Sequence, residues 1–285
     1  MTLSEEKKYL EKELSEIYSS KESERIFFIL LEHKTGFSAT DFFADKFIML
    51  TPEDSEWMSE SIARLKKGEP VQYVVGHTFF CGLQIKVNPS VFIPRPETEE
   101  LVSLIVEYMN EKRFSNASVL DVCSGSGCIA IALKKNFPDA VLSAIELSPE
   151  AIDMAKHNAS LYDVDINFIE GDVFKPTLPA EFMVDVIVSN PPYVLQSEKK
   201  SMSKTVYDFE PKEALFVPDK EPLLFYEAIS LLALKHLRKG GTVWFETSED
   251  RAGDVVDLLK RKYFDNVKVH TDMSRKKRFV SGGKG

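Results

Sequence analysis

The 285-residue chain has few cysteines and no long apolar run. Its three cysteines, Cys81, Cys123 and Cys128, do not suggest a disulfide framework, so we expect reduced thiols in a cytoplasmic protein. No apolar run approaches the roughly 20 residues that span a bilayer, and the acidic, amphipathic first residues do not resemble a secretory signal. These absences argue against a disulfide-rich secreted protein and against a membrane partner.

Positive charge and metal-ligand patterns are also scarce. With 36 Lys and Arg against 45 Asp and Glu, the net charge is −9, so we expect no broad phosphate-binding surface and no stable nucleic-acid partner. The one basic cluster, residues 274–279, is interpreted as a solvated strand or turn. The histidines are scattered and no CxxC occurs, so we predict no metal site. We expect a monomer.

Residues 1–70 predict a small helical bundle. Its best-marked helix begins after Thr51, a good N-cap residue, has Pro52 at the first helical position and ends before Gly68. No group of residues suited to catalysis lies in this region. It is interpreted either as purely structural or as a docking domain for a macromolecular substrate, and we expect the second.

Residues 71–96 are aromatic and β-branched, which predicts a β-hairpin linker. From residue 97 to 285, strand and helix patterns alternate along the chain. Such alternation predicts the α/β class, with a mostly parallel sheet covered by helices on both faces. Ligands of these sheets bind at the carboxyl ends of the strands.

A glycine-containing turn follows the first strand of this α/β region. It comprises Cys123, Ser124, Gly125, Ser126 and Gly127. The glycines let the backbone approach a ligand, and the helix that follows offers free N–H groups. Alone, the pattern also fits a tight turn without a ligand.

Two acids follow the next two strands. Glu146 comes about 20 residues after the turn, where an acid can accept hydrogen bonds from both ribose hydroxyls. Asp172 lies where a carboxylate can accept from the exocyclic amine of an adenine, and Val173 beside it is assigned to the same site. The alternatives are an exposed acid near the start of a helix for Glu146 and a turn-forming residue for Asp172.

The glycine turn also fits the GxGxxA pattern of an NAD-binding fold through Ala130, so a nicotinamide dehydrogenase is an alternative. The next strand favours another class, because it ends in Asn190, Pro191, Pro192 and Tyr193. Two prolines fix two φ angles and remove two donors, leaving a stiff turn between an amide and an aromatic ring. A dehydrogenase has no evident use for it.

Together, Asp121-x-Cys123-x-Gly125-x-Gly127, the two acids and Asn190-Pro-Pro-Tyr resemble class I S-adenosylmethionine-dependent methyltransferases that modify planar nitrogens. The stretch from Glu69 to Val102, with "FIPRPETE", and "DFEPKEAL" at 208–215 further resemble the HemK/PrmC family. That family methylates the side-chain amide nitrogen of the glutamine in the Gly-Gly-Gln motif of peptide chain release factors. The resemblance covers nearly the whole chain.

The resemblance implies a Rossmann-like methyltransferase domain that acts in translation termination. The cofactor would be S-adenosyl-L-methionine, released as S-adenosyl-L-homocysteine. The Asn190 side-chain carbonyl and the Pro191 backbone carbonyl would accept the two N–H groups of the target amide. Pro192 would hold this turn rigid, Tyr193 would pack over the amide, and Asn190 would also contact the cofactor.

The same resemblance places Phe92 and Pro94, with their neighbours in "FIPRPETE", along the cofactor pocket. An ion pair between Arg95 and Glu99 that ties the linker to the catalytic domain is an equally good interpretation. Four features depart from the family pattern. Cys123 replaces a usual glycine and Glu146 a commoner aspartate, Thr247 stands where a glycine is usual, and "FVPDKEP" replaces a glycine-rich turn. An adenine-specific nucleic-acid methyltransferase and a methyltransferase-like binding module without activity remain as alternatives.

Overall fold

The computed structural model describes residues 1–45, 47–114 and 116–285. These residues form two compact units. The first consists of Met1–His77 together with Met202–Phe209, and the second of Thr78–Ser201 together with Glu210–Gly285. Within the described residues, no helix is both long enough and apolar enough to cross a membrane.

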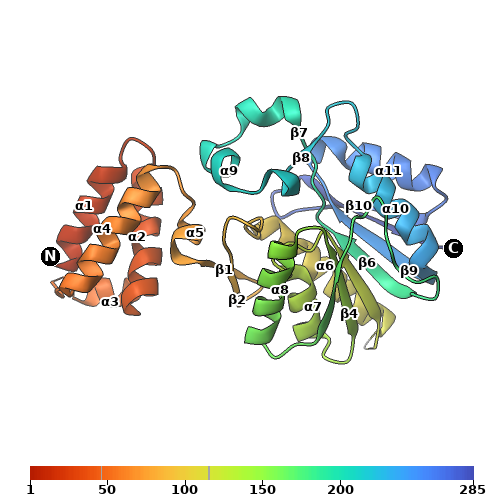
Figure 1. Ribbon diagram of the computed structural model, residues 1–285, viewed down its shortest axis with the longest axis horizontal. Coiled ribbons are helices and arrows are strands. Elements are labelled where there is room, and N and C mark those ends of the chain that lie inside the picture. Colours follow the sequence, from red (N-terminus) through yellow and green to blue (C-terminus); the bar gives the residue numbers. More distant parts are fainter. Residues whose placement is uncertain (46, 115) are drawn as a thin grey trace. The chain divides into compact units, whose positions relative to one another are not determined.

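The first unit is helical (Figure 1). Its helices are α1 (Leu3–Leu14), α2 (Ser20–Thr35), α3 (Ala39–Ala44), α4 (Pro52–Lys66), α5 (Val71–Val75) and α9 (Lys204–Phe209). Thr51 caps α4 by accepting a hydrogen bond from the Asp54 N–H, so the predicted start of this helix is confirmed. Buried side chains such as Leu10, Phe27 and Met58 form its core.

The second unit is built on a seven-stranded sheet with the order β10-β11-β9-β6-β3-β4-β5. The strands are β3 (Ser118–Val122), β4 (Val141–Glu146), β5 (Ile166–Glu170), β6 (Val184–Ser189), β9 (Leu237–Glu246), β10 (Asp265–Thr271) and β11 (Lys277–Gly283). β3, β4, β5, β6 and β9 are parallel, and β11 and β10 are antiparallel additions. The predicted α/β class with a mostly parallel sheet is confirmed.

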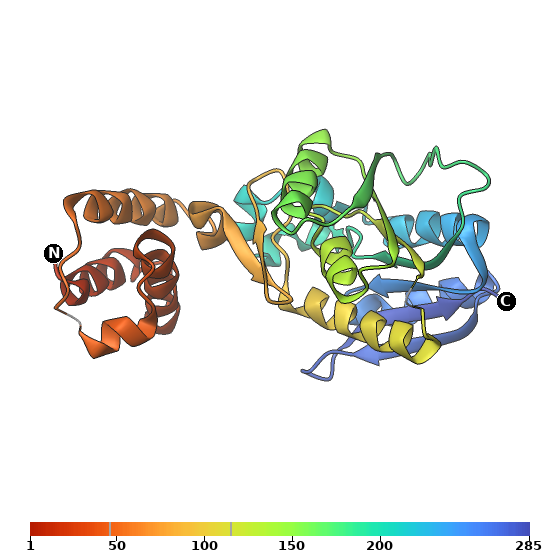
Figure 2. The same ribbon diagram turned by 90° about the horizontal axis from the view of Figure 1, so that it is seen from below.

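The α-helices that accompany this sheet in the described part of the chain are α6 (Pro96–Lys112), α7 (Cys128–Asn136), α8 (Pro149–Leu161), α10 (Leu224–His236) and α11 (Ala252–Arg261). α7 packs between α6 and α8, whereas α10 and α11 pack against each other. Figure 2 shows α6, in yellow, beside the blue strands of the sheet. The shorter elements are β7 (Val194–Leu195), η1 (Gln196–Ser201), η2 (Lys212–Ala214), β8 (Phe216–Val217) and η3 (Glu249–Arg251).

The predicted linker hairpin is shorter than its expected range, because α5 precedes it. Its strands are β1 (His77–Phe80) and β2 (Leu83–Lys86). The two residues between them, Cys81 and Gly82, have φ of 49° and 74°, as a two-residue hairpin turn with the twist of the strands requires. Asn158 of α8 holds β2 by exchanging two hydrogen bonds with the Lys86 backbone, at 2.8 and 3.0 Å.

The basic cluster at 274–279 lies in the turn between β10 and β11 and at the start of β11. Residues 274–277 are exposed, while Phe279 is buried in the sheet. The prediction of a solvated strand or turn is confirmed.

The direction of chain progression reverses between β3 and β6, since β4 lies on one side of β3 and β6 on the other. Val122, the last residue of β3, pairs with Ser189, the last residue of β6. In open α/β sheets a ligand binds beyond the carboxyl ends of the strands at this kind of reversal. The turns that begin at Cys123 and at Asn190 therefore start next to each other.

Candidate active site

The turn after β3 needs backbone conformations that side chains disfavour. Cys123, Gly125 and Gly127 have φ of 62°, 52° and 76°. Gly127 also needs space, since a Cβ there would lie 3.1 Å from the Ala155 Cβ, whereas a Cβ on Gly125 would meet no atom within 4 Å. Cys123 takes the left-handed conformation although it has a side chain. This side chain packs against the main core, the buried apolar cluster of the second unit that includes Leu120, Ile187 and Phe245.

Polar groups under this turn are buried. The Asp121 carboxylate accepts a hydrogen bond from the Ala130 N–H at 3.3 Å, while its other oxygen and the Ser124 hydroxyl have no partner among the described residues. Burial raises the pKa of Asp121 to about 8. Ser126 is buried too, and its carbonyl accepts from the Asn158 amide at 2.9 Å.

Glu146, at the end of β4, binds backbone N–H groups of two turns. One carboxylate oxygen accepts from Gly125 at 2.8 Å, and the other accepts from Leu147 at 2.8 Å and from Ser148 at 3.1 Å. A carboxylate has about four acceptor positions. Three are used here, so one ribose hydroxyl can be accepted without displacing a backbone donor. A second requires the carboxylate to turn.

Asp172 and Val173 follow β5. Asp172 accepts the Phe174 N–H at 2.8 Å through Oδ1, so it does form a turn, while Oδ2 is not used in this bond. Val173 is 7% exposed and belongs to the main core, so it can contribute only a wall to a ligand site. Two apolar residues that the sequence analysis did not single out are also exposed: Leu147, directly after Glu146, and Phe174, two positions after Asp172.

Asn190 belongs to a buried chain of hydrogen bonds that the sequence analysis did not predict. Its side-chain nitrogen donates to the Thr98 hydroxyl at 3.1 Å, and Thr98 donates to the Glu246 carboxylate at 2.7 Å. Thr98 comes from α6 and Glu246 from the end of β9. Thr98 and Glu246 are 3% and 2% exposed, so this polar chain lies inside the protein.

The rest of the motif is fixed by packing. Pro191 and Pro192 are buried, and Tyr193 is half-buried against the main core. Burial, and next the nearby Glu246 carboxylate, raise the pKa of the Tyr193 hydroxyl, so it stays neutral. Just before the motif, Ser189 donates to the Val122 carbonyl at 2.6 Å and joins the ends of β6 and β3.

The linker segment is held by an ion pair with a partner other than the expected one. Arg95 pairs with Glu210, which also accepts the Ile93 N–H at 3.2 Å. The interpretation of an Arg95–Glu99 pair is therefore wrong about the partner. The fold places Glu210, which is distant in the sequence, against the linker, where it pairs with Arg95. The Arg95 guanidinium lies 4.5 Å from the ring centre of Phe92, and Pro94 is buried.

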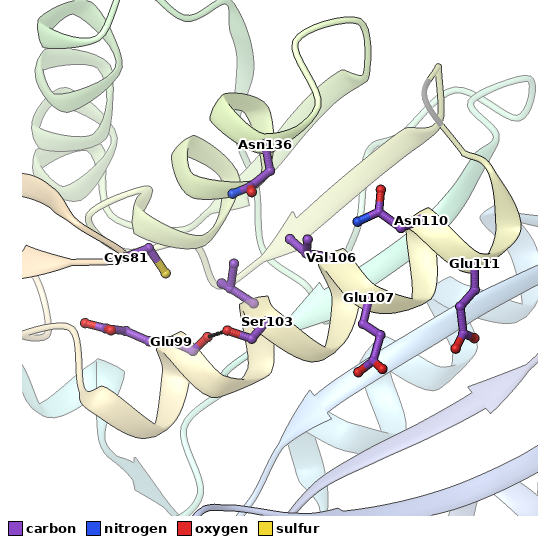
Figure 3. Close-up of a pocket in the computed structure, with 9 residues that line it drawn as sticks. Cys81, Glu99, Ser103, Val106, Glu107, Asn110, Glu111 and Asn136 are labelled. Atoms are coloured by element: carbon purple, nitrogen blue, oxygen red, sulfur yellow. Dashed lines mark hydrogen bonds between the residues drawn. The ribbon is translucent and has the colours of Figure 1, made fainter.

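A separate hollow of about 680 Å³ lies along α6 (Figure 3). Cys81 and Asn136 face it from the hairpin and from α7, and Glu99, Glu107 and Glu111 lie along its α6 side. Burial raises the pKa of the Cys81 thiol to about 12, which leaves the thiol uncharged and unreactive. The turns that begin at Cys123 and Asn190, and the acids Glu146 and Asp172, lie instead at the carboxyl ends of the strands.

The structure thus brings most predicted site residues to one edge of the sheet. The glycine turn, Glu146, Asp172 and Asn190 all follow carboxyl ends of neighbouring parallel strands. The described residues contain no group of three or more His, Cys, Asp or Glu able to hold a metal ion. A strand order of this kind, with a glycine turn, an acid and an Asn-Pro-Pro-Tyr turn at one edge, defines a class I methyltransferase.

Comparison with known proteins agrees with this class. Residues 82–209 match the model of the methyltransferase small domain, and residues 8–76 match that of the PrmC N-terminal domain. A solved methyltransferase from Pyrococcus furiosus shares the fold, with a TM-score of 0.51 and 20% identity over 72% of this chain and 90% of that one.

Full-length relatives define the family. The release factor glutamine methyltransferase of Bacteroides thetaiotaomicron is 38% identical over 97% of this chain and 98% of its own. That of Flavobacterium psychrophilum is 39% identical over 94% of each. The chain belongs to the release factor glutamine methyltransferase family.

Proposed function

We propose that this protein transfers a methyl group from S-adenosyl-L-methionine to the side-chain amide nitrogen of the glutamine in the Gly-Gly-Gln motif of release factors. The observation that supports it most directly is the pairing of Val122 with Ser189. This pairing sets a turn rich in glycine beside a turn made of Asn-Pro-Pro-Tyr. An adenine-specific activity is not favoured, because the full-length relatives are release factor enzymes.

The residues around the first turn suit the proposed cofactor. Gly125 leaves open space at its Cβ position, and the buried Ser124 hydroxyl has no hydrogen-bond partner among the described residues. Glu146 can accept one ribose hydroxyl, and Asp172 Oδ2 can accept an adenine amine. The exposed side chains of Leu147 and Phe174 offer apolar surface for the flat adenine ring. When bound, S-adenosyl-L-methionine supplies a methyl group on a positively charged sulfur.

The residues of the second turn would bind the target amide. The Asn190 side-chain carbonyl accepts one amide N–H and the Pro191 carbonyl accepts the other, while Tyr193 covers the amide plane. These acceptors orient the nitrogen and favour the positive charge that develops on it. The nitrogen forms a bond to the methyl carbon as the carbon–sulfur bond breaks; the sulfur keeps that electron pair and the nitrogen then loses a proton to water.

Positioning is the main contribution that this arrangement can make. An amide nitrogen is a weak nucleophile because its lone pair is delocalised into the carbonyl. Holding the reacting atoms at roughly 3–3.5 Å in the right orientation can lower a barrier by about 7–11 kcal/mol in favourable cases. Buried prolines at 191 and 192 keep the acceptors in place without reorganisation during the reaction.

The helical unit would dock the release factor. It has no residues with a proposed chemical role, yet α3 exposes 72% of Phe43, and Met49 after it is 67% exposed. Remote contacts of this kind can orient a reacting group that is itself small. Phe43→Ser should raise KM for intact release factor and leave the rate on a short Gly-Gly-Gln peptide unchanged. Leu231→Ser, at an exposed position of α10, is the matched control.

The function is tested with methyl-labelled S-adenosyl-L-methionine. The cofactor is offered with release factor, with a release factor whose motif glutamine is replaced by alanine, with DNA and with tRNA. Label is expected only in the unaltered release factor, at the glutamine side chain. Label in DNA or tRNA would support the adenine-specific alternative, and no label anywhere would support a binding module.

A further inference from the structure

The hydrogen-bond chain from Asn190 through Thr98 to Glu246 joins three elements that are distant in the sequence. The two bonds measure 3.1 and 2.7 Å, and Glu246 lies at the carboxyl end of β9. The 2.7 Å O–H···O distance is within the normal range for a hydroxyl that donates to a carboxylate oxygen. Only Asn190 in this chain belongs to the proposed catalytic motif.

The protons available to this hydrogen-bond chain determine the orientation of the Asn190 side-chain amide. An ionised carboxylate only accepts, so Thr98 must use its single hydroxyl proton on Glu246. The Thr98 oxygen can then only accept from Asn190, which must present its NH₂ group to Thr98. The Asn190 carbonyl oxygen is therefore on the opposite side of the amide group, where it can accept from a substrate.

The charges around Glu246 make its ionisation sensitive to pH. Burial is the main cause that raises the pKa of Glu246 to about 7. Glu97 of α6 adds to the rise, and the Thr98 bond, Arg278 of β11 and the Asn190 amide oppose it. Two neutral tyrosines also face it, Tyr193 and Tyr226, and the Tyr226 hydroxyl donates to the Glu246 backbone carbonyl at 3.1 Å. Both protonation states are accordingly accessible near neutral pH.

We infer that Thr98 and Glu246 are positioning residues that hold the Asn190 carbonyl towards the glutamine amide. This inference rests on the proposed function. Glu246 keeps Asn190 in the active orientation only as a carboxylate. Once protonated, it can donate to Thr98, and Thr98 can then donate to the Asn190 carbonyl and turn the NH₂ group towards the substrate. The ionisation of Glu246 thereby makes the methylation rate depend on pH, which the neutral glutamine amide does not do by itself.

The test compares Thr98→Val, which keeps the shape of the side chain, with Thr98→Ser, which keeps the hydroxyl. Thr98→Val should lower kcat roughly 10- to 100-fold, the usual cost of releasing a group that positions a reacting side chain. Its KM for release factor and its calorimetric affinity for S-adenosyl-L-methionine should change little. Thr98→Ser should restore most of the rate. The control is Thr242→Val, which also removes one buried threonine bond, to the Gly282 carbonyl, from the middle of β9.

The pH profile gives a second measurement, which does not depend on the stability of Thr98→Val. Wild-type kcat should fall as pH decreases through about 7, because Glu246 becomes protonated. Glu246→Gln cannot ionise, so this dependence should disappear between pH 6 and 8. An unchanged profile in Glu246→Gln would overturn the inference, and so would wild-type kcat in a folded Thr98→Val. If wild type itself fails to methylate release factor, the proposed function fails instead.

Discussion

The turns after β3 and β6 begin side by side and are built in opposite ways. The first, from Cys123 to Gly127, uses three left-handed backbone positions and keeps its N–H groups. The second, from Asn190 to Tyr193, has two prolines and so lacks two N–H groups. The N–H groups of Cys123, Ser124, Gly125 and Gly127 already donate inside the protein, so the first turn offers close approach and leads into the N–H groups at the start of α7. The second turn offers acceptors and rigidity.

This difference matches the two molecules that the site is proposed to join. A cofactor with a carboxylate and a ribose needs N–H donors and an acid, which the β3 and β4 ends provide. A primary amide brings its own two N–H donors. N–H groups on the protein at this place would bind the amide oxygen instead and reverse the orientation of the amide. A turn without N–H groups at 191 and 192 avoids that competition. Substitutions in each turn should therefore affect different measurements.

The largest effect is expected in the acceptor turn. Asn190→Ala removes one of the two proposed acceptors for the amide, and loss of such a contact commonly costs about 10²–10³ in rate. Affinity for S-adenosyl-L-methionine, measured by calorimetry, should change much less. Near wild-type turnover of Asn190→Ala would remove this residue from the mechanism.

The donor side should show the reverse pattern. Glu146→Ala removes a carboxylate that binds the Gly125 N–H and has one acceptor position left for a hydroxyl. The loss of a charge-assisted hydrogen bond predicts a weakening of S-adenosyl-L-methionine binding by about 1.5–3 kcal/mol. Glu170→Ala, in register with Glu146 on β5, is the control. Equal calorimetric affinity in the two variants would take Glu146 out of the cofactor site.

The sequence predicted local structure well because the signals for it are local. Thr51, Pro52 and Gly68 mark a helix without reference to any other segment, and alternating strands and helices predict a parallel sheet. The Thr98–Glu246 bond joins residues 148 positions apart, and no local pattern encodes it. One signal was present: Glu246 ends an apolar strand as Glu146 does. The Arg95 partner was missed for the same reason, since Glu210 is 115 positions away.

Gly125 and Gly127, both in the turn after β3, allow the effect of left-handed backbone strain to be measured separately from the effect of crowding. Gly127→Ala places a Cβ 3.1 Å from the Ala155 Cβ at a φ of 76°, so left-handed strain and overpacking add, to about 2 kcal/mol of lost stability. Gly125→Ala has the strain without the crowding and should lose about 1 kcal/mol. Urea unfolding of the two variants without ligand measures the difference. Equal losses in the two variants would show that crowding at Gly127 is relieved by small movements of Ala155, Ile131 or Phe168.

The smallest effect is expected at Cys123, where opposing contributions nearly cancel. Cys123→Gly relieves a left-handed side chain at φ 62°, which favours the variant by about 1–2 kcal/mol. The added freedom of the unfolded chain costs about 0.5–1 kcal/mol, and the thiol gives up its contacts with the main core, a loss of about 1 kcal/mol for a group of this size. Urea unfolding should therefore place Cys123→Gly within about 1 kcal/mol of wild type, with S-adenosyl-L-methionine affinity retained because the backbone conformation is unchanged. A loss well above about 2 kcal/mol would mean that the thiol supports the core beneath the turn after β3. A gain of that size would mean that Cys123 strains this turn as much as the alanine of Gly127→Ala is expected to.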